Sequence, residues 1–417
     1  MAAFQYIIKD VKGARSEGII KANSLDEAVD KLTAEGNTVI TVKTAAEGSF
    51  RGKMSLFDKL MLQIYKWRTG VGLKTLVFFT RQMATMFSAG LTIEKSISNL
   101  EKSEKNNKFR KVLVRIANDI KKGFSLSEAL EEHPGIFNPL YVSLVKAGEV
   151  SGTLHTILDE LAVYLEKLED TKRKVSTAMT YPTFILCFLI IVAFCLFYFI
   201  IPMFAKVYAD FDAELPIPTQ IAIAIASWIG ANVFYFFLII LGLVMTVFLI
   251  YLSDRGRFIM DNMVLHFPVI GGLMKNSILS KFARTFSILM TAGVPIMDTL
   301  ELSQDVVQNA VVEKAVADAR DMVKEGYTVA GALKRTGVFP ATLLQLVATG
   351  EETGDMDRLL AKAAEFYEKL VDSVIDRLSS LIEPLLIVLM AAVVGTIVIV
   401  IYLPIFNLGL AISAGAK

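Results

Sequence analysis

Long stretches without a charged residue are the most prominent pattern along this chain. They cover residues 175–205, 215–253 and 384–416. Each is longer than the roughly 20 apolar residues that a helix needs to cross the hydrocarbon core of a bilayer. Buried core helices of a soluble protein are the alternative, but such helices rarely carry apolar runs of this length. We therefore predict three transmembrane helices, at residues 182–204, 222–252 and 384–404.

Amphipathic helical patterns precede the first and the third predicted span, over residues 73–181 and 253–383. In the first of these segments Phe79, Met83 and Phe87 recur every four residues, which places them on one apolar face of a helix. Pairs such as Ala89-Gly90 mark the point where a helix stops. We predict that each segment folds as a bundle of antiparallel helices. The predicted fold is therefore a mainly α, polytopic membrane protein with two homologous cytoplasmic bundles.

A different pattern occupies residues 1–43, where short alternating segments predict a small α+β module. Ser24 and Glu27 have the spacing of a capping box, which marks the start of a helix. The expected order is strand, strand, helix, strand (ββαβ), with strands at residues 4–8, 17–22 and 38–43 and a helix that ends near Ala34. Residues 44–72 form a linker. Its middle, residues 54–67, is amphipathic and fits either a helix on the membrane surface or a solvated linker helix.

The chain repeats itself with an offset of 203 residues at the start of the repeat and 202 at its end. Arg284 stands where Arg81 stands in the first copy, and Pro384 stands where Pro182 does. A repeat over so long a stretch indicates two copies of one structural unit. The matching segments are residues 79–93 with 282–296, residues 123–130 with 326–333, Gly148-Glu149-Val-Ser-Gly152 with Gly350-Glu351-Glu-Thr-Gly354, and Pro182 and Pro202 with Pro384 and Pro404.

The repeat and the flanking charges predict the same topology. Basic residues 172–174 precede the first span and a net acidic segment, residues 205–221, follows it. The positive-inside rule then places the N-terminal side in the cytoplasm. Equivalent members of parallel repeats run in the same direction, so the first and third spans both leave the cytoplasm. The second span, which has no duplicate, returns the chain, and the tail at residues 405–417 is expected on the outer side.

The Gly-Glu-x-x-Gly motif occurs once in each copy, at Glu149 and Glu351, between two predicted helices. Glycine permits a tight backbone there, and the carboxylate beside it can cap the next helix or accept hydrogen bonds from an arginine. Two interpretations stay open. The motif is either a capped turn between helices or a surface loop that contacts a partner or an ion.

Arg81 and Arg284 are a second repeated feature, and each lies on a helix face that is otherwise apolar. A charged side chain in such a place usually has a partner of opposite charge. We expect each arginine to form an ion pair with a carboxylate across its bundle. The glutamate of the same copy, Glu149 or Glu351, is the candidate partner.

Composition and charge exclude several classes of function. The chain has 417 residues, of which 54% are hydrophobic, and its 43 Lys and Arg residues nearly balance 42 Asp and Glu residues. This balance gives no overall basic charge that would favour nucleic-acid binding. Cys187 and Cys195 both lie in the first apolar stretch, where we expect neither a disulfide nor a metal site.

Enzyme motifs are also missing from the sequence. It contains no Gly-x-x-x-x-Gly-Lys-Ser/Thr loop for nucleotides and no Gly-x-Ser-x-Gly, and its three histidines lack metal-ligand spacing. We predict that the chain is not an enzyme and needs no cofactor. A transporter or channel is a further alternative, but such proteins normally keep ionisable residues inside the bilayer, and the predicted spans have none. The remaining class is a scaffold with cytoplasmic bundles for a soluble partner and spans that bind other membrane helices.

Four segments together resemble a known family. They are residues 79–93 (Phe-Thr-Arg-Gln-Met-Ala-Thr-Met-Phe-Ser-Ala-Gly-Leu-Thr-Ile), residues 147–154 (Ala-Gly-Glu-Val-Ser-Gly-Thr-Leu), residues 178–182 (Ala-Met-Thr-Tyr-Pro) and residues 201–204 (Ile-Pro-Met-Phe). These segments are similar to the inner-membrane platform proteins of type IV pilus and type II secretion machines, the PilC/GspF family. The resemblance covers residues 73–410, and the N-terminal module also looks like that of the family.

The resemblance implies a function and a set of partners. It implies a multi-pass protein of the cell inner membrane with a periplasmic C-terminus, assembled as a dimer beside other inner-membrane assembly proteins. A hexameric cytoplasmic ATPase would dock against the bundles and drive pilin subunits into or out of the fibre. The pilus machine is favoured, and a secretion platform is the alternative. The candidate partner-binding residues are Arg81, Glu149, Arg284 and Glu351.

The family also suggests a metal site, because some members carry calcium in the first bundle on acidic residues. Glu94 and Glu149 match candidate positions for such ligands. Thr153 stands where the resemblance leads us to expect a third acidic ligand. We therefore expect no tight metal site in this chain.

Overall fold

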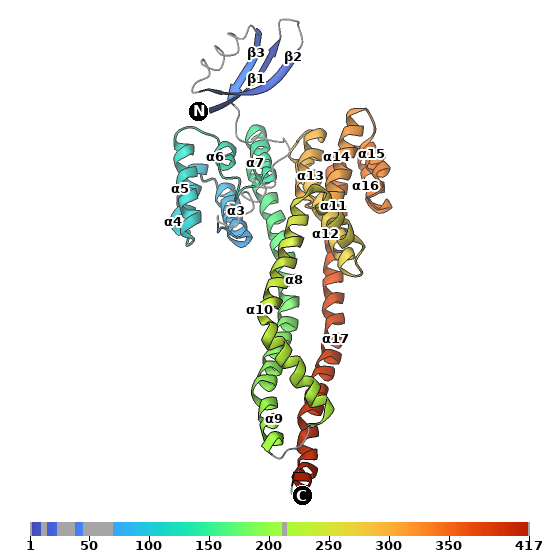
Figure 1. Ribbon diagram of the computed structural model, residues 1–417. Helices are drawn as coiled ribbons and strands as arrows, with labels where there is room; N and C mark the ends of the chain where they lie inside the picture. The colour runs from blue at the N-terminus through green and yellow to red at the C-terminus, as the bar shows by residue number, and fades with distance from the viewer. Residues whose placement is uncertain (1, 10–14, 23–37, 45–69, 211–214, 416–417) are drawn as a thin grey trace. The chain divides into compact units, whose positions relative to one another are not determined.

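The computed structural model of the protein describes residues 2–9, 15–22, 38–44, 70–210 and 215–415. The chain divides into two units, Met1–Ile64 and Tyr65–Lys417 (Figure 1). The first unit contains a three-stranded sheet, and every described helix belongs to the second unit.

The sheet of the first unit has the strand order β2-β1-β3. The central strand β1 (Ala2–Lys9) pairs antiparallel with both β2 (Arg15–Ala22) and β3 (Thr38–Thr44). A register shift between Ile7 and Ile8 interrupts the pairing with β3. The strands cover the three segments that the alternating pattern predicts. The helix expected between β2 and β3, and the amphipathic segment at residues 54–67, lie outside the described residues.

Five short helices and the start of a long one form the first bundle. Local signals begin these helices: the Ser125 hydroxyl accepts from the N–H of Glu128 while the Glu128 carboxylate accepts from the N–H of Ser125, a capping box. Apolar side chains at helical spacing, such as Leu113 and Ile116, are fully buried in one core. The helices are α3 (Leu73–Ser88), α4 (Ile93–Ser103), α5 (Asn107–Lys121), α6 (Leu126–Glu131), α7 (Pro139–Ser151) and the start of α8 (Leu154–Cys195).

The second bundle repeats this plan after one additional helix, α11 (Asp254–His266). Its core is built around residues such as Phe282 and Leu333, which are fully buried. The Asn309 side chain caps α14 by accepting from the N–H groups of Val311 and Val312. The repeated helices are α12 (Ile270–Thr291), α13 (Ile296–Val306), α14 (Ala310–Lys324), α15 (Val329–Thr336), α16 (Ala341–Thr353) and the start of α17 (Met356–Gly415).

The two bundles share apolar contacts. Ile288 and Leu289 on α12 belong to the core of the first bundle, together with Ala292. Below the bundles, the Lys174 ammonium on α8 donates to the Asp372 carboxylate on α17 at 2.8 Å. Periodicity predicts that α12 has an apolar face, but it does not predict that part of this face packs into the core of the first bundle. Because they share a core, both bundles lie on the same side of any membrane that the long helices cross.

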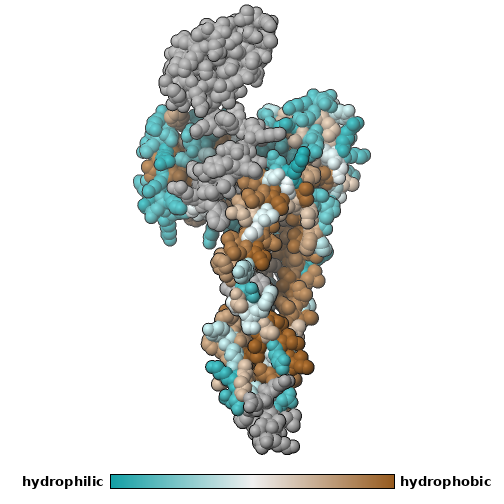
Figure 2. Space-filling model, viewed as in Figure 1, coloured by the Kyte–Doolittle hydropathy of each residue, from teal (hydrophilic) through white to brown (hydrophobic). Residues whose placement is uncertain are grey.

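Two continuous helical stretches are long and apolar enough to cross a membrane. One is Leu154–Asp210, in which α8 continues through a π-helical turn, η1 (Leu196–Ile200), into α9 (Ile201–Asp210). The other is Met356–Asn407 within α17. Figure 2 shows apolar residues along these long helices and mainly polar residues over the bundles. This distribution is that of a membrane protein with water-exposed bundles.

The second predicted span corresponds to α10 (Ile217–Leu252), which differs from the other two because it is bent. Its segments Ile217–Asn232 and Phe237–Leu252 meet at 65°. By length and composition the described chain therefore has two spanning helices, or three if this bent pair is one span.

The repeated prolines near the ends of the two long helices that lie away from the bundles are accommodated in two different ways. A proline inside a helix has no N–H, so the carbonyl four residues earlier loses its helical donor. At Pro404 this is the carbonyl of Val400, and the hydroxyl of Thr219 on α10 donates to it at 2.9 Å. At the equivalent Pro202 the preceding turn is instead π-helical, with the N–H of Ile201 donating to the carbonyl of Leu196.

Candidate functional site

The carboxylate of the Gly-Glu-x-x-Gly motif caps a short helix in each copy. Glu149 on α7 accepts from the N–H groups of Leu126 at 2.6 Å and Ser127 at 3.2 Å, the first turn of α6, and from the Ser127 hydroxyl at 2.5 Å. Glu351 accepts in the same way from the N–H groups of Val329 at 2.7 Å and of its neighbour in α15 at 3.1 Å. These donors are N–H groups that have no partner within their own helix.

The capped helix is not the one expected from the sequence. The motif was predicted to cap the next helix, α8 or α17, whereas it caps the preceding one. The reason is that the chain reverses between α6 and α7, which brings the end of α7 beside the start of α6. The interpretation as a capped turn is thus realised, over a separation of 22 or 23 residues along the chain.

The two glycines of each motif have separate structural tasks. A Cβ on Gly148 would lie 3.0 Å from Cα of Leu154, and a Cβ on Gly350 would lie 2.7 Å from Cα of Met356, so the first glycine permits close approach of the next helix. The last glycine, Gly152, has φ +72° and ends α7 in the left-handed conformation that glycine tolerates best. Each motif is therefore a tight corner that holds three helices together.

Arg81 forms the predicted ion pair across the first bundle, but with different carboxylates. Its guanidinium donates to both carboxylate oxygens of Glu166 on α8, at 2.6 and 2.8 Å, and to Asp159 at 2.5 Å. These two carboxylates hold the pKa of the Arg81 guanidinium above its usual range. The prediction that Glu149 is the partner of Arg81 is wrong, because the Glu149 carboxylate already accepts hydrogen bonds from the start of α6.

The second copy has the equivalent ion pair, and its side chains are more buried. Arg284 donates through Nε and Nη2 to Glu368 on α17, at 3.1 and 2.8 Å, and Glu351 is again not its partner. The Arg284 side chain is 14% exposed, against 34% for Arg81. Each arginine therefore ties the first long helix of its bundle to the helix that continues into an apolar span.

The partners Glu166 and Glu368 were missed by the sequence analysis, although a signal for them exists. Glu166-Lys-Leu-Glu-Asp170 recurs as Glu368-Lys-Leu-Val-Asp372, in register with the rest of the repeat. Extending the repeat by this segment would have identified a repeated carboxylate on the helix opposite each arginine. Asp159 has no acidic equivalent, because Ala361 stands at that position.

The candidate metal ligands do not come together in the described part of the chain. No group of three or more His, Cys, Asp or Glu side chains is placed there to hold an ion. Glu149 is engaged as a helix cap, and the hydroxyl of Thr153 lies 2.6 Å from that of Ser151. The four candidate partner-binding residues thus make contacts within the chain. Each copy has one corner, at Glu149 or Glu351, and one ion pair that we call a clamp, Arg81–Glu166 or Arg284–Glu368.

Comparison with known proteins adds to this geometry. The family model for type II secretion system protein F matches residues 79–202 and 282–404, one match per repeat, and the model for its N-terminal domain matches residues 1–43. A type IV pilus assembly protein PilC of Thermus thermophilus is 36% identical over 98% of both chains. A PilC of Myxococcus xanthus is 40% identical over 82% of both chains. A type II secretion system protein F of Pseudomonas aeruginosa is 30% identical over 98% of this chain and 99% of its own.

Proposed function

The chain belongs to the type II secretion system protein F family, and from this premise we propose that it is the inner-membrane platform of a type IV pilus assembly machine. The platform couples a hexameric cytoplasmic ATPase to the insertion or removal of pilin subunits. The higher identity to pilus assembly proteins than to the secretion protein supports the pilus machine. The platform itself hydrolyses no ATP, since the sequence carries no nucleotide-binding loop.

One observation carries this proposal: each bundle continues without interruption into a helix that is long and apolar enough to span a membrane. The clamps Arg81–Glu166 and Arg284–Glu368 tie each bundle to its own long helix. A tilt or rotation that a motor imposes on a bundle would therefore reach the membrane through α8 and α17. Both helices are continuous from the clamp to their apolar part.

The proposal includes three spans, at residues 182–204, 222–252 and 384–404, with a cytoplasmic N-terminus and a periplasmic C-terminus. The core shared by the two bundles supports it, because a chain that leaves the cytoplasm along α8 has to return before α12. The bent α10 is the helix available for that return. Reporter fusions should read outside at Asp212 and Lys417 and cytoplasmic at Arg255. A cytoplasmic reading at Asp212 would refute this topology.

The corners at Glu149 and Glu351 are proposed as part of the motor-docking surface, because they fix α6 and α15 relative to the rest of each bundle. Reversing the charge of both glutamates should weaken binding of the motor or pilus assembly while the protein still accumulates in the membrane. Glu→Gln variants, which keep an acceptor for the helix N–H groups, separate loss of charge from loss of the cap. If motor binding and piliation are unchanged in both the charge-reversed and the Glu→Gln variants, these glutamates have a purely structural role.

A strain without this protein tests the function as a whole. We expect loss of surface pili in electron micrographs, with restoration by the wild-type gene. A type II secretion platform is the second candidate, supported by the secretion relative that is 30% identical over nearly the whole chain. In that case the strain would keep its pili and lose secreted enzymes from the culture medium. Intrinsic ATP hydrolysis by the purified protein, abolished by a point mutation in this chain, would overturn both assignments.

A further inference from the structure

The charge of the whole chain is balanced, but the charge of α5 is not. Residues 107–122, which comprise α5 and its C-cap, contain six Lys and Arg residues against one Asp, a net charge of +5. The equivalent residues of the second copy, 310–325, comprise α14 and its C-cap. They contain three Lys and Arg against four Asp and Glu, a net charge of −1. The two copies share one fold and differ most in charge at this helix pair.

The basic side chains of α5 are exposed and largely without acidic neighbours. Lys122 pairs with Asp119 at 2.8 Å. Within the described part of the chain, no carboxylate forms a salt bridge with four further basic residues of this stretch: Arg110, Lys111, Arg115 and Lys121. All four of these residues are exposed. Like charges four residues apart, as at Lys111 and Arg115, destabilise a helix by a few tenths of a kilocalorie.

The equivalent helix α14 pairs several of its charges within the second bundle. Its first-turn Glu313 accepts from Arg257 of α11 at 2.5 Å. Arg320 lies within 3.3 Å of Glu301 on α13 and within 3.5 Å of its neighbour Asp321. The excess of basic charge is therefore a property of α5 that α14 does not share, and a partner outside the bundle is the available source of negative charge.

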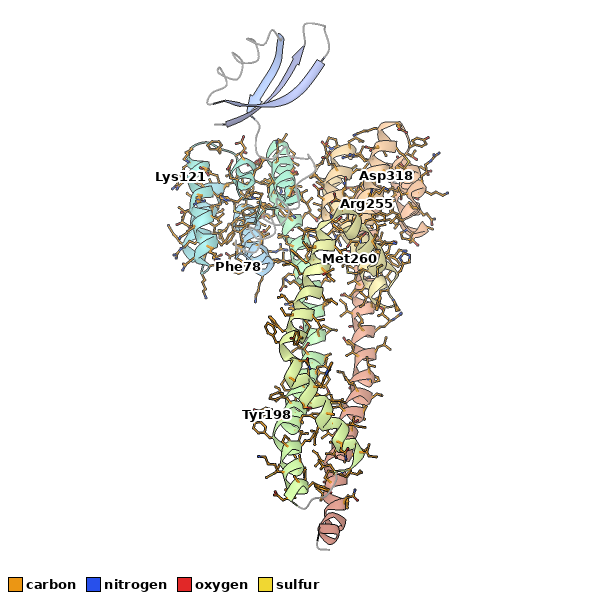
Figure 3. All side chains as sticks on the ribbon, in the orientation of Figure 1. Phe78, Lys121, Tyr198, Arg255, Met260 and Asp318 are labelled. Carbon is orange, nitrogen blue, oxygen red and sulfur yellow. The ribbon has the colours of Figure 1, made fainter. Side chains whose placement is uncertain are left out.

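The basic face is held rigidly. Phe109, Leu113 and Ile116 anchor the opposite side of α5 in the core and have no exposed surface. Val114, which is 37% exposed, lies among the basic residues, so the face combines charge with apolar area as protein interfaces do. Figure 3 shows Lys121 on the outer flank of the first bundle, while Asp318 marks α14 in the second.

We propose that the basic face of α5, formed by Arg110, Lys111, Val114, Arg115 and Lys121, is a docking surface for an acidic surface of a soluble protein. A membrane surface fits less well, because Figure 3 shows Lys121 on the outer flank of the first bundle, far from Tyr198 in the apolar part of the long helices. Single-stranded nucleic acid fits less well too, because it needs exposed aromatic rings for stacking and the one aromatic residue of α5, Phe109, is buried.

The proposal gives the two bundles different tasks. The field of this face, whose four basic residues carry a charge of +4, steers an acidic partner to the first bundle and fixes its orientation there. The inference rests on the proposed function only in that a soluble component of the assembly has to exist. It adds which bundle receives that component and which helix makes the first contact.

The repeat supplies a matched control for the test. The variant Lys111→Glu/Lys121→Glu reverses two charges on α5, and Lys314→Glu/Lys324→Glu reverses the repeat-equivalent charges on α14. Full-length protein is placed in nanodiscs of phosphatidylcholine, and binding of poly-L-glutamate is measured by fluorescence anisotropy. The α5 variant should bind this probe about tenfold more weakly than wild type. The α14 variant should stay within about twofold of wild type, and high salt should weaken binding in all three proteins.

Several outcomes would overturn the proposal. One is equal loss of poly-L-glutamate binding in the two variants, provided both keep the wild-type thermal midpoint. Others are α5-dependent binding of duplex DNA or of phosphatidylglycerol vesicles that is tighter than binding of poly-L-glutamate. The motor ATPase of the same organism separates this inference from the proposed function. If that ATPase does not bind wild type, the proposed function fails; if it binds wild type and the α5 variant equally, only the assignment of α5 fails.

Discussion

The hydrogen bond from Thr219 to the carbonyl of Val400 offers a direct test of how α10 is joined to α17 far from the bundles. Thr219 has no exposed surface, and its hydroxyl replaces the N–H that Pro404 lacks. Thr219→Val keeps the shape of the side chain and removes the donor. Val400 is buried in an apolar cluster with Ile201 and Ala222, so its carbonyl loses the hydroxyl that donates to it.

The expected cost follows from that isolation. Leaving a buried hydrogen-bonding group without its partner costs about 1–3 kcal/mol, whereas measured side-chain hydrogen bonds in a membrane protein average about 0.6 kcal/mol. We expect Thr219→Val to lower the free energy of unfolding by about 1–2 kcal/mol. Pro404→Ala restores an N–H four residues after Val400. In that background the same substitution should cost less than about 0.5 kcal/mol.

A double-mutant cycle measures this coupling. Unfolding of the purified protein by SDS in mixed micelles is followed for wild type, Thr219→Val, Pro404→Ala and the double variant. Thr219→Ser keeps the hydroxyl and should remain close to wild type. An equal cost of Thr219→Val with and without Pro404→Ala would show that the hydroxyl does not compensate for the proline, and the reasoning would be wrong.

Three further predictions concern the corners and the clamps, and the same unfolding assay checks all of them. Gly350→Ala should cost about 1–3 kcal/mol because its Cβ would meet the backbone of α17 at 2.7 Å; Gly395→Ala, where no atom lies within 4 Å, should not destabilise. Arg284→Ala, which strands a mostly buried carboxylate, should cost roughly 1–3 kcal/mol, and Arg81→Ala, at a more exposed pair, less than about 1 kcal/mol. Glu351→Ala should cost about 1 kcal/mol through loss of the α15 cap, with Glu351→Gln recovering most of it. An equal loss of unfolding free energy in the two variants of any of these comparisons would contradict the contact assigned there.

The repeat accounts for most of what the sequence could predict. It identified two equivalent bundles and the arginine clamp in each, because both depend on residues that recur at a fixed offset. The clamp's partner was assigned to Glu149, since the short motif was conspicuous and the long amphipathic run around Glu166 was not. Distance along the chain gives no guide here, as Arg81 and Glu166 are 85 residues apart.

Contacts that occur in only one copy of the repeat could not be predicted from the sequence. Periodicity shows that α12 has an apolar face but not that Ile288 and Leu289 turn toward the other copy. Equivalent prolines suggest equivalent helix ends, yet Pro202 follows a π-helical turn while Pro404 relies on a hydroxyl from α10. That hydroxyl belongs to the one apolar segment without a repeat, so comparing the copies could not reveal it.

The side chains that α12 contributes to the first bundle also constrain how the protein is made. Helices α3–α7 and the start of α8 are synthesised before α10 and α12, so the core of the first bundle still lacks Ile288, Leu289 and Ala292 at that stage. In the proposed topology, a newly made first bundle would keep an open apolar surface until α10 has returned the chain to the same side of the membrane. A chain in which α10 failed to return would keep that surface exposed to proteases and chaperones. In the proposed topology, completion of the first core would therefore depend on α10 returning the chain across the membrane.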